Sequence, residues 1–170
     1  ALRQANAYYS PEEVALLFGY FDASADDAGD HWSGTRVYSC LSHDIVAHET
    51  THAILDGYRP HFSDPDATLD EHALHEGVAD VVAMLSVFSS TGRVAQQIDA
   101  SAVARGGAVE GDEGLTASGL FGVADGLYSR HALRRSVTGS TPVDWRAERE
   151  PHRRGEVLVR ALMDTVMAMW

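Results

Sequence analysis

The distribution of apolar and polar residues predicts a strand-forming N-terminal segment. Two short runs rich in aromatic and aliphatic residues, 6–9 and 15–21, have the composition of strands. They flank the turn-forming residues 10–13, so we predict a hairpin. The alternative is a helix that begins at Ser10, with a proline in its first turn. The acidic segment 22–34, rich in small residues, predicts a surface loop.

The next two segments have the pattern of helices. Residues 44–57 are free of proline, carry an acid, Asp44, where the helix dipole favours one, and end at Gly57. A glycine suits the position just after a helix, so we expect the helix to stop there. Residues 70–85 are almost entirely apolar after Glu76, which predicts a second helix.

The C-terminal half is less regular until its last helix. Residues 90–115 mix Ser, Gly and charge, which favours loops around a short helix at 94–103. Residues 119–136 have a weak helical pattern, and we predict that His131 within them is a surface histidine. Pro151 suits the first turn of a final helix, and we expect its apolar stripe to contain Val157, Leu158, Ala161 and Leu162.

Together these elements predict an α+β fold. A small N-terminal sheet with an exposed edge strand would pack on the helix at 44–57, and a mainly helical lobe would follow. We expect the lobes to comprise residues 1–90 and 91–170. The apolar run that ends at Trp170 has no stop signal, so we expect the natural protein to continue beyond it.

The first helix contains the motif His48-Glu49-Thr50-Thr51-His52. Residues four apart lie one turn apart on the same face of a helix, so two imidazoles there can bind one Zn²⁺. Glu49 lies beside the metal rather than on it, where a carboxylate can accept a proton from the attacking water. The alternative is a buried amphipathic helix with incidental histidines.

The second helix offers a third ligand. Glu76 and Asp80 are four residues apart, in a run that is otherwise apolar. Burying two acids there without partners would cost roughly several kcal/mol of folding free energy. A metal bound by one acid and a histidine paired with the other would remove that cost. We therefore expect Glu76 on the metal and Asp80 behind a ligating histidine. His72, one turn before Glu76, is a rival ligand, and a solvated acidic stripe is the alternative.

These residues resemble the gluzincin pattern, most closely that of the thermolysin-like metallopeptidases. The resemblance rests on the HExxH motif, on the Glu-x-x-x-Asp motif at 76–80, and on the apolar residues that flank the histidines. It implies a zincin-like fold with one zinc ion on His48, His52 and Glu76. One departure is His75, which stands where the family usually has Asn; it could hydrogen-bond in the same place.

The resemblance also implies a substrate edge and an oxyanion donor. Asn6, Ala7 and Tyr9 match a family strand that pairs with the backbone of an extended substrate, a case of β-augmentation. His152 resembles the histidine that donates to the tetrahedral oxyanion. The alternatives are an ordinary core hairpin and a surface histidine at a helix start. Calcium is not predicted, because the acids downstream of Asp44 that would complete such a site are not evident.

Composition restricts the remaining possibilities. A net charge of −12 argues against nucleic-acid binding. The single cysteine, Cys40, excludes an internal disulfide, and we expect it to be a small buried hydrophobe. No signal-peptide pattern is visible, and no apolar run approaches the ~20 residues of a membrane span. The compartment and the oligomeric state are left undetermined.

The predicted reaction is peptide-bond hydrolysis with Glu49 as general base. Two other classes stay open: a zinc-binding or scaffold domain without activity, and a zinc hydrolase that acts on a non-peptide bond. A third alternative is a protein that binds no metal. The three ligand atoms of His48, His52 and Glu76 must converge on one point for the prediction to hold.

Overall fold

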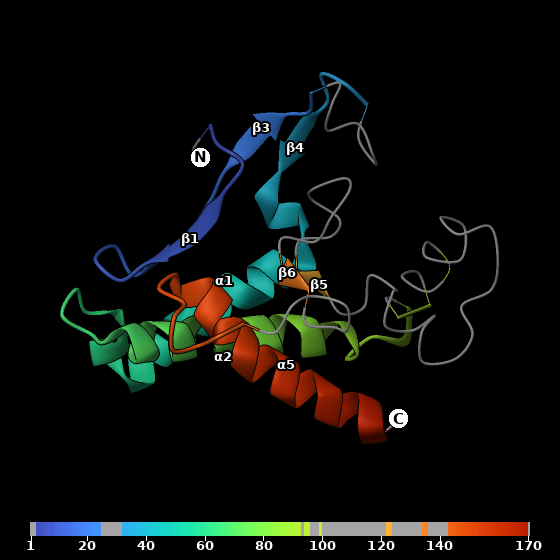
Figure 1. The fold of residues 1–170 in the computed structure, drawn as a ribbon. Coiled ribbons are helices and arrows are strands. Elements are labelled where there is room, and N and C mark those ends of the chain that lie inside the picture. Colours follow the sequence, from blue (N-terminus) through green and yellow to red (C-terminus); the bar gives the residue numbers. More distant parts are fainter. Residues whose placement is uncertain are drawn as a thin grey trace.

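The computed structural model describes residues 3–24, 32–92, 94–95, 99, 122–123, 134–135 and 143–169. Within them the chain is α+β and mostly helical. Figure 1 shows the N-terminal strands on one side of the helices. Strand β1 (Ala7–Ser10) lies close to α1 (His43–Tyr58), and α5 (Pro151–Met169) crosses α2 (Leu69–Val87). Among these residues no helix is long and apolar enough to cross a membrane.

The predicted hairpin is confirmed. Strand β1 (Ala7–Ser10) pairs antiparallel with β2 (Ala15–Phe18), with Ala7 opposite Phe18 and Ser10 opposite Ala15. The Ser10 hydroxyl accepts a hydrogen bond from the Glu13 amide within the turn, at 3.3 Å. Val14 ends the turn at φ 48°, a conformation that branched side chains rarely adopt, so the strand pairing must offset its cost.

The second predicted run divides at Gly19. After β2 the chain enters β3 (Tyr20–Asp22), which pairs with β4 (Arg36–Tyr38), a strand that the sequence pattern did not indicate. The predicted surface loop therefore starts too early. Asp22 ends a strand and is paired with Arg36, and Ala23 is buried. Residues 25–31 lie outside the described part.

Cys40 was expected to be buried, and that prediction is wrong. It is exposed in the short helix η1 (Ser39–Leu41). The turn directs Ser39 inward instead, and its hydroxyl donates to the main-chain oxygens of Asn6 and Gly19 at 3.1 and 3.0 Å. The inward position suits the Ser39 hydroxyl because two main-chain oxygens there need a donor. With Ser39 directed inward, the next residue in the turn, Cys40, faces solvent.

The helix α1 (His43–Tyr58) contains the predicted segment and begins, as expected, with Asp44 in its first turn. The prediction that it stops before Gly57 is wrong. The helix continues through Tyr58 and is capped by Arg59, whose amide donates to the Leu55 oxygen at 2.7 Å. Pro60 follows and starts η2 (Pro60–Ser63). A residue before proline is pushed out of the helical region, which explains the stop.

The helix α2 (Leu69–Val87) begins with a capping box. The Thr68 hydroxyl accepts from the Glu71 amide at 3.3 Å, and the Glu71 carboxylate accepts from the Thr68 amide at 2.7 Å. This arrangement satisfies main-chain donors that the first turn would otherwise leave unpaired. It fixes the start of the helix that carries Glu76.

The helix α5 (Pro151–Met169) begins at Pro151 as predicted. Of the predicted apolar stripe only Leu158 is half-buried, close to Gly77 of α2, and the prediction is wrong for Val157, Ala161 and Leu162, which are exposed. The buried positions of α5 are Gly155, Val159 and Met163, whereas Val157 and Leu162 are 38% and 42% exposed. The reason is the contact with α2. Gly155 lies so close to Gly77 that a Cβ on Gly155 would approach the Gly77 nitrogen to 2.9 Å.

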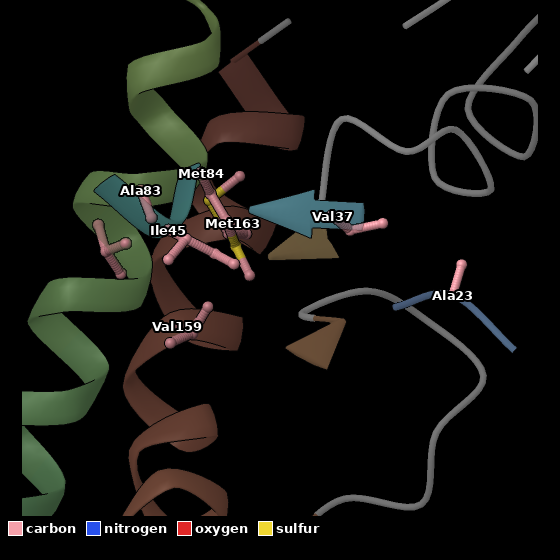
Figure 2. Packing of buried hydrophobic residues seen from close by; sticks show 8 residues of the cluster. Ala23, Val37, Ile45, Ala83, Met84, Val159 and Met163 are labelled. Atoms are coloured by element: carbon pink, nitrogen blue, oxygen red, sulfur yellow. The ribbon is translucent and has the colours of Figure 1, made fainter. Parts of the chain in front are cut away.

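One hydrophobic cluster joins the strands to the three helices. It contains residues from the strand end, from α1, from α2 and from α5: Ala23, Val37, Ile45, Val81, Ala83, Met84, Val159 and Met163. Figure 2 shows Met84 and Met163 side by side where the green α2 meets the red-brown α5, with Ile45 beside them. The last described strands, β5 (Gly122–Val123) and β6 (Arg134–Arg135), form a separate pair.

The division into lobes 1–90 and 91–170 stays a prediction. The expected helix at 94–103 and the segment around His131 lie almost entirely outside the described residues. What the structure adds is that α5 packs directly on α2, and this contact brings the start of α5 to the helix that carries Glu76.

Candidate metal centre

The two histidines of the HExxH motif lie side by side on the inner face of α1. His48 and His52 are both buried, at 4% and 8% exposure. Their Nε2 atoms are 2.9 Å apart, and the rings are nearly perpendicular, at 87°. The one-turn spacing thus directs both nitrogens to one point.

Glu76 on α2 completes the group. Its Oε2 atom lies 3.4 Å from the Nε2 of His48 and 3.5 Å from the Nε2 of His52. The three side chains come from two helices packed against each other, and they form a group that could hold a metal ion. The rival ligand His72 is not part of this group.

Asp80 and His75 lie behind the two histidines. Asp80 is fully buried, and its Oδ1 is 2.9 Å from the Nδ1 of His48. The Nδ1 of His75 lies 2.9 Å from the Nδ1 of His52, with the two rings stacked. A histidine that ligates through Nε2 carries its proton on Nδ1, where an outer partner can accept it and fix the ring. Each histidine of the motif has such a partner.

The protonation of His75 follows from its position. Burial, helped by repulsion from His52, lowers the pKa of His75 from 6.5 to about 4. The ring is therefore neutral near pH 7, as an acceptor of the His52 proton must be. Its own Nε2 is buried and has no hydrogen-bond partner among the described residues.

The charge of Glu76 is fixed by its neighbours. Burial would raise the pKa of the Glu76 carboxyl, but the neighbouring imidazoles of His152, His48 and His52 outweigh it and hold that pKa well below its usual range. Glu76 is consequently a carboxylate near neutral pH, which is the form a metal binds.

His152 lies beside this group, in the first turn of α5. Its Nε2 is 3.1 Å from the Oε2 of Glu76, and its Nδ1 is 2.7 Å from the Oε1 of Glu150. The His152 side chain is 42% exposed, whereas the Glu76 oxygen that it contacts is buried. The contact between α2 and α5 brings together residues that are 76 positions apart in the sequence.

Glu49 is buried next to strand β1. Its Oε2 accepts a hydrogen bond from the Tyr9 amide at 2.9 Å, and the Tyr9 hydroxyl donates to Asp56 at 2.8 Å. Asn6 is exposed, and its main-chain oxygen accepts from Gly19 within the sheet. Ala7 is half-buried on the same strand. The predicted edge strand and the predicted base thus lie next to each other.

Two residues with evident roles at this site were missed from the sequence. Asp56 lies seven positions after Glu49, two turns along the same face of α1, and that spacing could have identified it. Glu150 accepts from the amides of His152 and Arg153 at 3.1 and 2.8 Å and so caps α5. The sequence could have indicated this cap, because Glu150 is an acid that immediately precedes a proline at the start of a predicted helix.

We compared the chain with protein-family models, with curated proteins and with solved structures, and none of the three comparisons finds a match.

Proposed function

We propose that the chain is a zinc-dependent peptidase of the zincin-like, gluzincin type. The observation that carries the proposal is the set of separations among the Nε2 atoms of His48 and His52 and the Oε2 of Glu76, 2.9–3.5 Å. A tetrahedral ion with bonds of about 2.0–2.2 Å separates its ligand atoms by about 3.3–3.6 Å. The separations of Glu76 from His48 and His52, 3.4 and 3.5 Å, match this range, and the two imidazole nitrogens, 2.9 Å apart, would move apart by a few tenths of an ångström to bind zinc.

The donor chemistry supports the same ion. Two imidazoles and one carboxylate are the protein ligands typical of a catalytic zinc, which keeps its fourth position open. The partners at Asp80 and His75 match the outer contacts that orient such histidines. When bound, the ion would polarise a carbonyl and make water a stronger nucleophile near neutral pH.

The chain's own residues would then carry the proton transfers. Glu49 accepts the proton from the attacking water and passes it to the leaving amine. His152 donates to the oxygen on which negative charge develops, since its exposed ring borders the cluster. The free edge of β1 at Ala7 holds the substrate backbone in an extended conformation, and the exposed Asn6 contacts the substrate through its side chain.

The test combines metal analysis with a substitution that keeps the site intact. We expect the purified chain to contain one zinc per molecule and to cleave casein or labelled peptides. Glu49→Gln should keep the zinc and lose about 10²–10⁴-fold in activity, because only the proton acceptor is removed. Glu12→Gln, on the exposed hairpin turn, is the matched control and should retain full activity.

The other outcomes separate the alternatives. Stoichiometric zinc without cleavage of any peptide would leave a zinc-binding or scaffold domain. Hydrolysis of esters or other non-peptide bonds, with peptides untouched, would leave a different zinc hydrolase. A chain that binds no zinc would contradict the proposal altogether.

A further inference from the structure

We propose that Tyr9 and Asp56 form a positioning pair that holds the Glu49 carboxylate in place through the Tyr9 main-chain amide. The inference rests on the proposed function, because it assigns Glu49 the role of general base. It gives Tyr9 a different role from the substrate contact expected from the sequence, since both its amide and its hydroxyl are bonded within the chain.

The first step is the direction of the Tyr9 amide. In an antiparallel pair, alternate residues direct their main-chain groups to the partner strand and away from it. The Gly19 amide donates to the Asn6 oxygen at 2.8 Å, so the main-chain groups of Asn6 face β2. Because the direction alternates, the main-chain groups of Tyr8, two residues on, face β2 as well. Ala7 and Tyr9 therefore direct their main-chain groups to the opposite edge, where the Tyr9 amide donates to Glu49.

The second step is the span of the contact. Figure 1 shows β1 approaching α1, and Glu49 and Asp56 are seven residues apart on that helix. Seven residues are about two turns, or about 10.5 Å along the axis, so the two acids share one face. Tyr9 bonds both of them, one through its amide and one through its phenol. A single residue thus fixes where the strand lies along the helix.

The third step is the state of the phenol. The hydrogen bond to Asp56, together with burial and the charge of that carboxylate, raises the pKa of Tyr9 above its usual value of 10. The hydroxyl therefore remains a donor over the whole range in which a peptidase would work.

The consequence for catalysis is orientation. With Oε2 held by the Tyr9 amide, the Glu49 carboxylate keeps one rotamer, and Oε1 remains to accept the proton from water. Misplacing a catalytic group by about 1 Å can cost about 10²-fold in rate. If the strand shifts along α1, the amide leaves Oε2 and this orientation is lost.

The test removes the phenol but keeps the ring and the amide. We expect Tyr9→Phe to lower kcat about 10-fold, with KM and zinc content unchanged. Asp56→Ala should give the same loss, and combining the two should cost no more than either alone. Asp56→Asn keeps a carbonyl acceptor for the phenol and should retain most of the activity. Tyr8→Phe, which removes the neighbouring exposed phenol, is the control.

A second measurement separates this inference from the proposed function. Amide hydrogen exchange at position 9 in the zinc-loaded protein should be faster in Tyr9→Phe than in the wild type, and unchanged in Tyr8→Phe. If the wild type cleaves no peptide but this difference is present, the proposed function fails and the pair still positions Glu49. Unchanged exchange together with unchanged kcat overturns the inference. A higher KM at constant kcat also overturns it, because Tyr9 would then be a substrate contact.

Discussion

At the scale of single residues, the centre depends on which nitrogen of each histidine carries a proton. His75 has to be neutral to accept the proton of His52, and burial keeps it so by lowering its pKa to about 4. In the unfolded chain the same group titrates near 6.5. Between these values the unfolded chain binds more protons than the folded one, so the free energy of unfolding falls as the pH falls.

We therefore expect the metal-free protein to lose stability between about pH 6.5 and pH 4, and His75→Asn to reduce that loss. A single proton contributes at most about 1.4 kcal/mol per pH unit, and the asparagine removes a share of this while still accepting from His52. Urea unfolding in the presence of a chelator, at several pH values, measures how steeply the free energy of unfolding depends on pH. His61→Asn, which removes an exposed histidine outside the cluster, should leave the dependence of the free energy of unfolding on pH as it is. An unaltered slope in His75→Asn would contradict the assignment.

At the scale of elements, the centre depends on how closely α5 approaches α2. A Cβ on Gly155 would lie 2.7 Å from the Ala73 oxygen and 2.9 Å from the Gly77 nitrogen, and both atoms are main chain and cannot rotate away. His152, which contacts Glu76, lies one turn before Gly155 on the same helix. The two glycines thus allow the approach by which α5 presents His152 to the cluster.

We expect Gly155→Ala to destabilise the protein by about 1–2 kcal/mol. Forcing a methyl group into a packed contact typically costs about 1–3 kcal/mol, and the gain in helix propensity of about 0.5–1 kcal/mol returns only part of it. Chemical denaturation measures the difference. Gly57→Ala is the matched control, because nothing lies within 4 Å of its Cβ in α1, and it should stabilise the protein. Equal effects of the two substitutions would show that the close approach is unimportant.

The same elements explain what could be predicted from the sequence. The group of His48, His52 and Glu76 was predictable, because the spacing within each helix determines which residues share a face, and two such faces need only pack together. The buried face of α5 was not, because Val157 and Leu162 are as apolar as Val159 and Met163. Only the partner helix decides between them, through a glycine contact that has no signal in hydrophobic periodicity. The exposure of Cys40 was missed for a similar reason, since it depends on Ser39 meeting two distant main-chain oxygens.

At the scale of the whole molecule, the candidate metal group and its neighbour His152 lie where three helices meet. His48 and His52 belong to α1 and Glu76 to α2, and His152 brings α5 to the same carboxylate. The cluster borders the hydrophobic core through Asp80, which is fully buried on α2 between the core residues Ala79 and Val81. A ligand that binds only the folded chain stabilises all of these contacts together.

We therefore expect zinc to raise the melting temperature of the whole described fold in one transition. A free metal concentration of 100 times the dissociation constant adds about 2.7 kcal/mol, which for a chain of this size corresponds to about 5–10 °C. Thermal unfolding followed by circular dichroism, with zinc and then with excess chelator, measures the shift. His48→Ala should abolish the response to zinc, because one of three ligands is lost. His61→Ala, which removes a histidine with a side chain 53% exposed, should keep the response. A melting temperature indifferent to zinc in the wild type, or a response retained in His48→Ala, would mean that these helices are held together without a metal at their junction.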